Sequence, residues 1–363
     1  MYRREIKQRP MVLFTPDVAR PSSILFHRQA ILSTLLMTGI IAIGPIPAFA
    51  KNDGGQRSNS MRMDSTSVPR ECQDLDDAAA TLEKGDLRVM SFNIRYGTAN
   101  DGANHWDRRR EFLVETIKDF APDLLGTQET LDFQKRYLDR HLDGYKSIGV
   151  GRDNGDEKGE MTAIWFRSDR FEVIASGHLW LSETPEIPGS VSWDSSMTRM
   201  ASWIKLRETQ DAALSPILFI NTHFDHIGKR AREESAKLLM EFIQAQGQGC
   251  AVLLTGDFNA SDRERPYDIF FGEAQAKIEE ADGDQTTIRL RDTYRVINPK
   301  RGDNEGTFSG FSAERTGGAR IDWIGVSDAW LVIDAAIDRT SREGLTPSDH
   351  FPITAILRRS NPQ

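Results

Sequence analysis

The chain has 363 residues, of which 39% are hydrophobic and 28% are charged, and its formal net charge is −8 at pH 7. These values are typical of a soluble globular protein that contains one large domain or two small ones. The two cysteines, Cys72 and Cys250, form neither a thiolate metal motif nor a redox Cys-x-x-Cys motif. They either pair in an oxidising compartment or leave Cys250 as a buried free thiol.

The first 50 residues have the features of a secretory signal peptide. Six Arg or Lys residues precede an apolar run over residues 30–46, and Ala48-Phe49-Ala50 forms an A-x-A cleavage pattern. This order is typical of a cleaved signal, so we expect a periplasmic or secreted protein with no integral membrane role. An uncleaved N-terminal membrane anchor is the alternative, since about 20 apolar residues span a bilayer. Gly44, Pro45 and Pro47 break the end of the run and favour cleavage.

Removal of residues 1–50 makes the protein more acidic. The segment holds six Lys or Arg and two Asp or Glu, so 40 basic and 52 acidic residues remain, a net charge of −12. An acidic surface repels polyanions and argues against a binder of duplex DNA. Residues 51–85 are rich in Ser, Asp, Gly, Arg and Gln and are predicted to be a flexible linker. Residues 86–360 show no second change in composition and are predicted to form one catalytic domain.

From Leu87 onward, short apolar runs alternate with amphipathic ones. Strands are predicted at residues 87–94, 123–127, 163–166, 171–178, 201–206, 217–222, 251–255, 321–326 and 351–357. Helices are predicted at 107–120 and 230–244, where apolar residues recur on one helical face. The strands at 163–166 and 171–178 are expected to form a hairpin. Many strands with two or three long helices favour an α+β fold of packed sheets flanked by helices.

Polar side chains lie where these apolar runs end. They are Asn93, Gln128, Glu129, Asn221, His223, Asp257, Asn259, Asp322, Asp349 and His350. Each one taken alone is commonly a turn or cap residue. Burying them together costs free energy unless they share partners or a cation. Carboxylates and amides suit a hard cation such as Mg²⁺ or Mn²⁺, whereas the ligand motifs of zinc are absent.

The sequence resembles the endonuclease/exonuclease/phosphatase (DNase I-like) superfamily, and in particular its exported bacterial members. The matching motifs, in chain order, are Ser-Phe-Asn93-Ile, Gln-Glu129, Asn-Thr-His223, Gly-Asp257-Phe-Asn259, Arg-Ile-Asp322-Trp and Ser-Asp349-His350. The resemblance covers residues 87–357 and implies a four-layer sandwich of two mainly antiparallel β-sheets flanked by helices. It also implies a phosphoester hydrolase that uses Mg²⁺ or Mn²⁺ on a small molecule or a nucleic acid. We expect a monomer without a stable protein partner.

The resemblance and the chemistry of these residues predict a one-step in-line attack of water on phosphorus. Asp257 is expected to position and deprotonate the water, and Asn259 to donate its amide N–H to a phosphate oxygen. His350 is expected to bind the phosphate, with Asp322 fixing its tautomer. The predicted catalytic residues are His223, Asp257, Asn259, Asp322 and His350, and the predicted metal ligands or metal-orienting residues are Asn93, Glu129 and Asp349.

Further residues are candidate substrate contacts, namely Trp106, Arg109, Glu160, Arg199 and His226. Trp106 and Arg109 begin the first predicted helix, where backbone amides favour anions; a core tryptophan and a surface ion pair are the alternatives. The loops expected to determine specificity are 97–107, 149–160, 182–199 and 301–318. Two alternatives to a small-molecule phosphoesterase remain open, which are a secreted nuclease acting on DNA or RNA and a catalytically silent binding module with the same fold.

Overall fold

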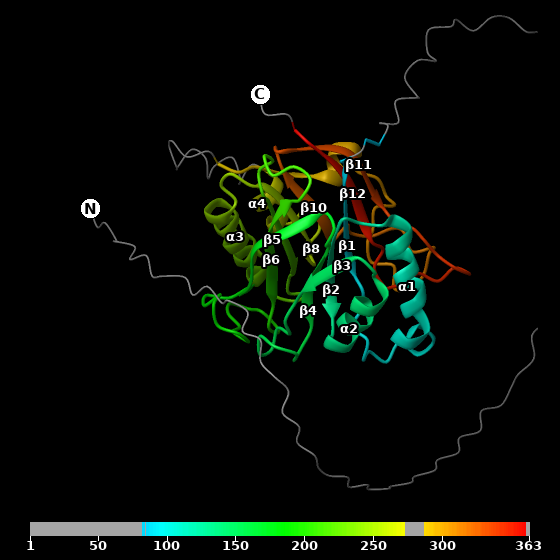
Figure 1. Cartoon of the computed structure of the whole chain (residues 1–363). Helices are drawn as coiled ribbons and strands as arrows, with labels where there is room; N and C mark the ends of the chain where they lie inside the picture. The colour runs from blue at the N-terminus through cyan, green and yellow to red at the C-terminus, as the bar shows by residue number, and fades with distance from the viewer. Residues whose placement is uncertain (1–81, 84, 273–286, 361–363) are drawn as a thin grey trace, which may run out of the picture. The chain divides into compact units, whose positions relative to one another are not determined.

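The computed structural model describes residues 82–360 except residue 84 and residues 273–286 (Figure 1). The predicted signal peptide, Cys72 and nearly all of the predicted linker lie outside the described residues. Cys250 is half-buried, not buried, and no described cysteine pairs with it; its pairing with Cys72 stays a prediction. Within the described part of the chain, no helix is both long enough and apolar enough to cross a bilayer.

Two six-stranded sheets form the centre of the described domain. The first has the order β11 (Trp330–Ile337), β12 (Ile353–Arg359), β1 (Leu87–Asn93), β2 (Leu124–Thr130), β4 (Met161–Arg167) and β3 (Tyr145–Ile148). The second has the order β5 (Phe171–Trp180), β6 (Met200–Glu208), β7 (Ile217–His223), β8 (Ala251–Asp257), β10 (Asp322–Ser327) and β9 (Leu290–Asp292). Only β1–β2 and β7–β8 pair in parallel among these strands, so the predicted, mainly antiparallel sheets are confirmed.

Helices cover the outer face of each sheet (Figure 1). The helices are α1 (Trp106–Phe120), α2 (Asp132–His141), α3 (Lys229–Gln246), α4 (Arg265–Phe271) and the short α6 (Thr293–Ile297), with a 3₁₀ turn η1 (Gly102–Asn104) before α1. Apolar side chains of α1 and α2 pack on the first sheet, and those of α3 and α4 on the second. A third apolar cluster fills the space between the sheets. These layers confirm the α+β sandwich.

Side-chain hydrogen bonds cross the interior between the two sheets. The Asn221 amide nitrogen on β7 donates to the carbonyl oxygens of Thr127 (2.8 Å) and Ala163 (3.0 Å) in the other sheet. Gln128 donates to Asn221 Oδ1 at 2.7 Å. A Cβ on Gly126 would lie 2.4 Å from the Thr255 hydroxyl oxygen, so only glycine permits this close approach. Asn221 and Gln128 therefore hold the sheets together.

The structure corrects one predicted pairing. Residues 163–166 and 171–178 were expected to form a hairpin, but they belong to β4 and β5, which lie in different sheets. β4 pairs with β2 and β3, whereas β5 pairs with β6. A short polar turn between two apolar runs is compatible with either arrangement, because period-two alternation identifies strands and not their partners. The turn therefore crosses from one sheet to the other.

Candidate active site

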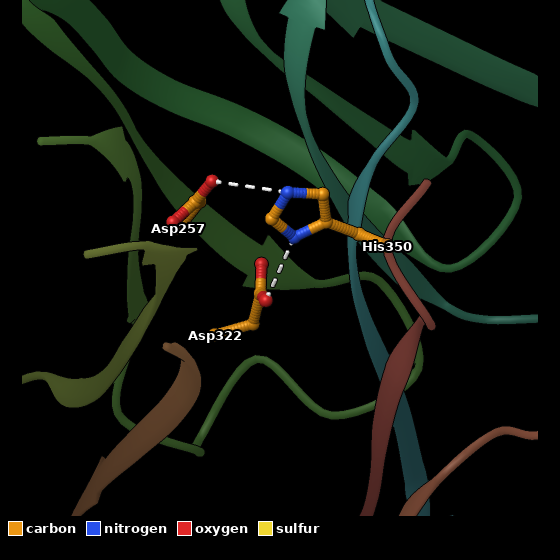
Figure 2. A group of neighbouring side chains, drawn as sticks. All are labelled: Asp257, Asp322 and His350. Atoms are coloured by element: carbon orange, nitrogen blue, oxygen red, sulfur yellow. Dashed lines mark hydrogen bonds and ion pairs between the residues drawn. The ribbon is translucent and has the colours of Figure 1, made fainter. Parts of the chain in front are cut away.

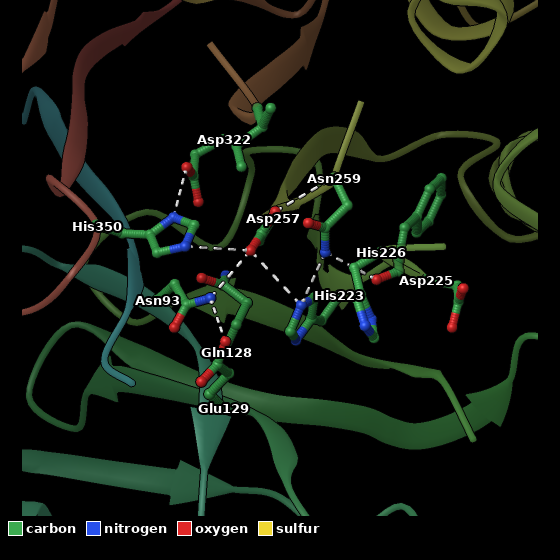
Figure 3. A network of polar contacts seen from close by, with 12 residues as sticks. Asn93, Gln128, Glu129, His223, Asp225, His226, Asp257, Asn259, Asp322 and His350 are labelled. Atoms are coloured by element: carbon green, nitrogen blue, oxygen red, sulfur yellow. Dashed lines mark hydrogen bonds and ion pairs between the residues drawn. The ribbon is translucent and has the colours of Figure 1, made fainter. Parts of the chain in front are cut away.

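The polar strand ends meet at one edge of the sandwich. The parallel pairs place the carboxyl ends of β1, β2, β7 and β8 at this edge, and the antiparallel neighbours β10 and β12 bring their amino ends to it. The register pairs Asp257 with both His223 and Asp322. Asn93 of the first sheet donates to Asp257 Oδ2 of the second at 2.9 Å, and so joins the two halves of the site (Figure 3).

Asp257 lies at the centre of this cluster and is 1% exposed. Its Oδ2 accepts from Asn93 and its Oδ1 accepts from the Asn259 backbone N–H at 3.0 Å. Burial and the negative charge of Asp322 raise the pKa of Asp257 to about 7, against the opposing effect of His350. A carboxylate with a pKa near neutrality is suited to accept a proton from water.

His350 lies between two carboxylates (Figure 2). Its Nδ1 is 3.0 Å from Asp322 Oδ2 and its Nε2 is 3.7 Å from Asp257 Oδ2. Burial by itself lowers the pKa of His350, but the charges of Asp322 and Asp257 outweigh burial and raise this pKa well above its ordinary value. The raised pKa favours the imidazolium form of His350. Its Nδ1 is hydrogen-bonded to Asp322, which holds the orientation of the ring, and its Nε2 lies at ion-pair distance from Asp257.

His223 is electrostatically different from His350. Burial and the positive charges of Arg199 and Arg152 lower the pKa of His223 well below its ordinary value, so its ring is neutral. The Asn259 amide nitrogen lies 3.1 Å from His223 Nε2 and donates to the Phe224 carbonyl oxygen at 3.1 Å. The side-chain amide of Asn259, which was expected to contact phosphate, is hydrogen-bonded within the protein and orients His223.

Unusual backbone conformations gather around the site. Arg95 (φ 57°), Glu129 (φ 57°) and Asn259 (φ 47°) adopt the left-handed conformation that side-chain-bearing residues seldom take. Glu129 lies where the register between β2 and β4 shifts. Such strain persists where the surrounding structure imposes it, and it is common at functional sites. Here it turns three polar residues at strand ends out of the regular pleat.

Two groups of side chains have the chemistry to hold a divalent cation. Glu129 and Asp349 line the cavity, and Arg95 places a positive charge near both, with Arg95 Nη1 4.0 Å from Glu129 and Arg95 Nε 3.6 Å from Asp349. Burial, together with repulsion from Glu129, raises the pKa of Asp349. Asn93 donates to Glu129 at 3.0 Å and does not line the cavity.

The second group was not predicted as a metal site. Ligand atoms of Asp257, Asp322 and His350 lie within 4.8 Å of one another. In this group, however, the imidazole is already hydrogen-bonded to Asp322, whereas hard cations prefer oxygen ligands. The carboxylate pair Glu129–Asp349 therefore fits Mg²⁺ or Mn²⁺ better than the Asp-Asp-His group does.

A cavity of about 680 Å³ opens onto these residues. The predicted site residues in its lining are Glu129, Glu160, Arg199, His223, His226, Asp257, Asn259, Asp349 and His350. Asn93 and Asp322 lie behind this lining and contact the cavity residues. Of the four predicted specificity loops, 149–160, 182–199 and 301–318 reach the cavity, whereas 97–107 does not.

The predicted substrate contacts Trp106 and Arg109 are wrong. Trp106 is 2% exposed and packs in the core beneath α1. Arg109 is buried as well, and it donates to the carbonyl oxygens of Ile94, Arg95, Asn104 and Pro347. A guanidinium satisfied by main-chain carbonyls fixes the segment after β1 and does not reach the cavity. The start of a helix marks an anion site only where its first turn is accessible.

Sequence reasoning missed several cavity residues, including Arg95, Arg152 and Phe308. Arg95 follows Asn93 by two positions, so its place at a strand end was a usable signal. Arg152 lies in loop 149–160, which was expected to determine specificity, but Arg152 itself was not singled out. Phe308 stacks edge-on against His350, with ring centroids 5.3 Å apart. That contact joins residues 42 positions apart, and no local pattern indicates it.

A family model described as "Endonuclease/Exonuclease/phosphatase family" matches residues 90–350. The chain belongs to the endonuclease/exonuclease/phosphatase family. Members of this family hydrolyse phosphoesters and generally depend on divalent metals. Membership of the family disfavours the silent-module alternative.

Solved structures and a curated relative show which members of the endonuclease/exonuclease/phosphatase family this chain is similar to. A Bacteroides thetaiotaomicron protein of the family is 34% identical with a TM-score of 0.66, covering 76% of this chain and 98% of its own. A mannosyl-6-phosphatase from the same organism is 34% identical with a TM-score of 0.65, covering 75% and 99%. Mouse nocturnin is 22% identical over 297 residues, which cover 73% of this chain and 63% of nocturnin. The chain thus spans less than two thirds of this curated relative.

Proposed function

We propose that this protein is a Mg²⁺- or Mn²⁺-dependent phosphomonoesterase that acts on a small phosphorylated substrate. The observation that carries this proposal is a single cavity lined by a proton-accepting carboxylate, a cationic imidazole and a pair of carboxylates suited to a cation. The 34% identical mannosyl-6-phosphatase supports a small sugar phosphate as the substrate class. The acidic composition of residues 51–363 disfavours a nucleic-acid polyanion.

Each residue has a defined part in the proposed reaction. Asp257 accepts the proton of the attacking water, and His350 donates hydrogen bonds to the phosphoryl oxygens while Asp322 keeps it oriented. Neutral His223, held by Asn259, hydrogen-bonds to the leaving oxygen. Glu129 and Asp349 would hold the cation, oriented by Asn93. A divalent cation there would neutralise charge on the phosphoryl group.

A substrate panel with and without EDTA tests this function. We expect EDTA to abolish hydrolysis of p-nitrophenyl phosphate and of hexose 6-phosphates, and Mg²⁺ or Mn²⁺ to restore it. Bis-p-nitrophenyl phosphate and single-stranded or duplex nucleic acid should be hydrolysed more slowly, because they lack the terminal phosphate and nucleic acid is repelled. Activity that survives EDTA would contradict metal dependence, and faster cleavage of nucleic acid would favour the nuclease.

We also propose that the protein is exported and acts in the periplasm or outside the cell. Support comes from residues 1–50, with their basic region, apolar run and A-x-A pattern. We expect the protein recovered after export to begin at Lys51, as read by N-terminal sequencing. Recovery of exported protein that still contains residues 31–50 would exclude cleavage and leave the membrane anchor.

A further inference from the structure

One wall of the cavity carries a polar cluster that makes no direct contact in the proposed hydrolysis of phosphate, although its arginines lower the pKa of His223. It consists of Arg152, Glu160 and Arg199, which we call the guanidinium–carboxylate subsite. All three line the main cavity. A second cavity of about 10 Å³ lies between them and His223, and it has room for one oxygen atom. The cluster therefore adjoins the site on the His223 side.

Arg152 and Glu160 form a closely matched ion pair in this wall. Arg152 Nη1 donates to Glu160 Oε2 at 2.9 Å and Nη2 donates to Oε1 at 2.7 Å. The two side chains are only 11% and 18% exposed. Burial raises the pKa of Glu160 even though Arg152 opposes that change. A desolvated ion pair is weak evidence for stability, so its presence in a cavity wall calls for a functional reason.

The loop that carries this pair is held rigidly. Gly151, Arg152 and Asp153 donate backbone N–H groups to the carbonyl oxygens of Asp156, Glu160 and Lys158. The Trp180 indole N–H also donates to the Arg152 carbonyl oxygen at 2.6 Å. Both members of the pair are thus placed by the backbone before any ligand arrives, which reduces the entropy lost on binding.

Arg199 supplies hydrogen-bond donors that lack acceptors. Its side chain is 4% exposed, and Nη2 is bonded to His226 Nδ1 at 3.0 Å. Among the described residues, no group accepts a hydrogen bond from Arg199 Nε or Nη1. The Asp225 carboxylate is 3.7 Å from Nε, which neutralises charge without forming that bond. Buried donors of this kind favour an oxygen acceptor supplied by a ligand.

The charges of the subsite favour hydroxyl groups over a second anion. Arg152 is balanced by Glu160, and Arg199 is balanced by Asp225. The cluster is therefore close to neutral, yet it offers guanidinium donors beside carboxylate oxygens that have lone pairs to spare. A hydroxyl group both accepts and donates, so it satisfies both partners. A second phosphate would satisfy the donors and be repelled by Glu160.

We propose that the guanidinium–carboxylate subsite binds ring hydroxyl groups of the alcohol that carries the phosphate, with a hydroxyl donating to Glu160 and accepting from Arg199. This inference rests on the proposed phosphomonoesterase function and specifies its substrate as a polyhydroxylated phosphomonoester. The apolar side chains of Phe308 and Met197 also line the cavity, which suits the C–H faces of a sugar ring.

The test compares Glu160→Gln and Arg199→Gln with wild type on two Mg²⁺-supported substrates. One is mannose 6-phosphate, and the other is p-nitrophenyl phosphate, whose leaving group has no hydroxyl to bind. We expect kcat/KM for mannose 6-phosphate to fall by at least tenfold more than for p-nitrophenyl phosphate. A differential of about 10- to 100-fold is what one or two charge-assisted hydrogen bonds supply.

Matched controls and substrate analogues separate the outcomes. Glu157→Gln, in the same loop, and Arg207→Gln, on β6, alter exposed ion pairs with Arg136 and Glu172 and should leave both activities unchanged. A mannose 6-phosphate analogue lacking one ring hydroxyl should lose activity on wild type and lose no more on Glu160→Gln. Equal losses on both substrates would place these residues at the phosphate and overturn the proposal. Faster wild-type turnover of hexose bisphosphates that depends on Arg199 would also overturn it.

Failure of this proposal differs from failure of the proposed function. If wild type hydrolyses both substrates with Mg²⁺ and the variants keep the wild-type ratio of kcat/KM values, the subsite proposal alone is wrong. If wild type hydrolyses no phosphomonoester with Mg²⁺ or Mn²⁺, the proposed function is wrong and the subsite proposal fails with it.

Discussion

Asp257→Asn is expected to reduce kcat/KM by about 10²- to 10⁴-fold while the protein stays folded, because removal of a general base typically costs that much. The amide cannot accept the proton of the attacking water. It can still accept from the Asn259 backbone N–H, as Asp257 Oδ1 does at 3.0 Å. Steady-state kinetics on p-nitrophenyl phosphate with saturating Mg²⁺ measures the loss.

The stability of Asp257→Asn separates chemistry from folding. Burial and the charge of Asp322 already disfavour the carboxylate at this position. A neutral amide removes that cost, but it keeps only one of the two acceptor oxygens and leaves the Asn93 amide nitrogen facing a donor. The Tm should therefore fall modestly while the protein stays folded. Asp169→Asn, on the exposed turn between β4 and β5, serves as the control and should retain full activity. A loss of less than tenfold in Asp257→Asn would remove Asp257 from the role of base.

His350→Gln is expected to produce the second large loss, on the order of 10²-fold or more in kcat/KM, since it removes a preorganised cationic donor. The buried Asp322 and Asp257 carboxylates also lose the positive charge between them. The Tm should fall as a result, because removing one partner of a buried ion pair leaves an uncompensated charge. Activity is therefore to be measured per folded protein, with the folded fraction taken from circular dichroism.

A double-mutant cycle tests whether Asp322 acts through His350. Asp322→Asn alone should cost less activity than His350→Gln, because the imidazole remains in place. In the His350→Gln background, Asp322→Asn should add almost nothing, as expected for residues that work as a unit. Additive losses would show that Asp322 has its own part in the reaction. His141→Gln, at the carboxyl end of α2, is the distant control.

Local sequence patterns predicted the strands that carry the site more reliably than they predicted how those strands pair. β1, β7, β8 and β10 were placed to within two residues at each end, because each is an apolar run that ends in a polar residue. The strands β3, β9 and β11 and the helices α2, α4 and α6 were missed. The patterns of β3 and α2 are mostly polar or half-buried. The hairpin error at β4 and β5 has the same origin, because strand partners depend on contacts that no local window contains.

In the candidate site, too, the residues with the relevant chemistry were predicted better than their positions in the fold. Asp257, Asp322 and His350 were found because burying acids and imidazoles at strand ends costs free energy unless they have polar partners. Trp106 and Arg109 were misassigned because the start of a helix was taken as an anion site, although their spacing from Leu113 places them on the core-facing side of the helix. Arg95 and Arg152 were missed for the opposite reason, since an arginine in a loop is ordinarily a solvated surface residue.

The sequence by itself determined the α+β class, the family and the residue types that perform the chemistry. These follow from the periodicity of apolar residues and from polar groups too costly to bury without partners. Only the tertiary structure decided that the pKa of His350 is raised and that of His223 lowered, because each pKa depends on which charges the fold brings near. The fold likewise placed Arg152, Glu160 and Arg199 in one cavity wall, where burial makes their hydrogen bonds and ion pairs stronger than they would be in water.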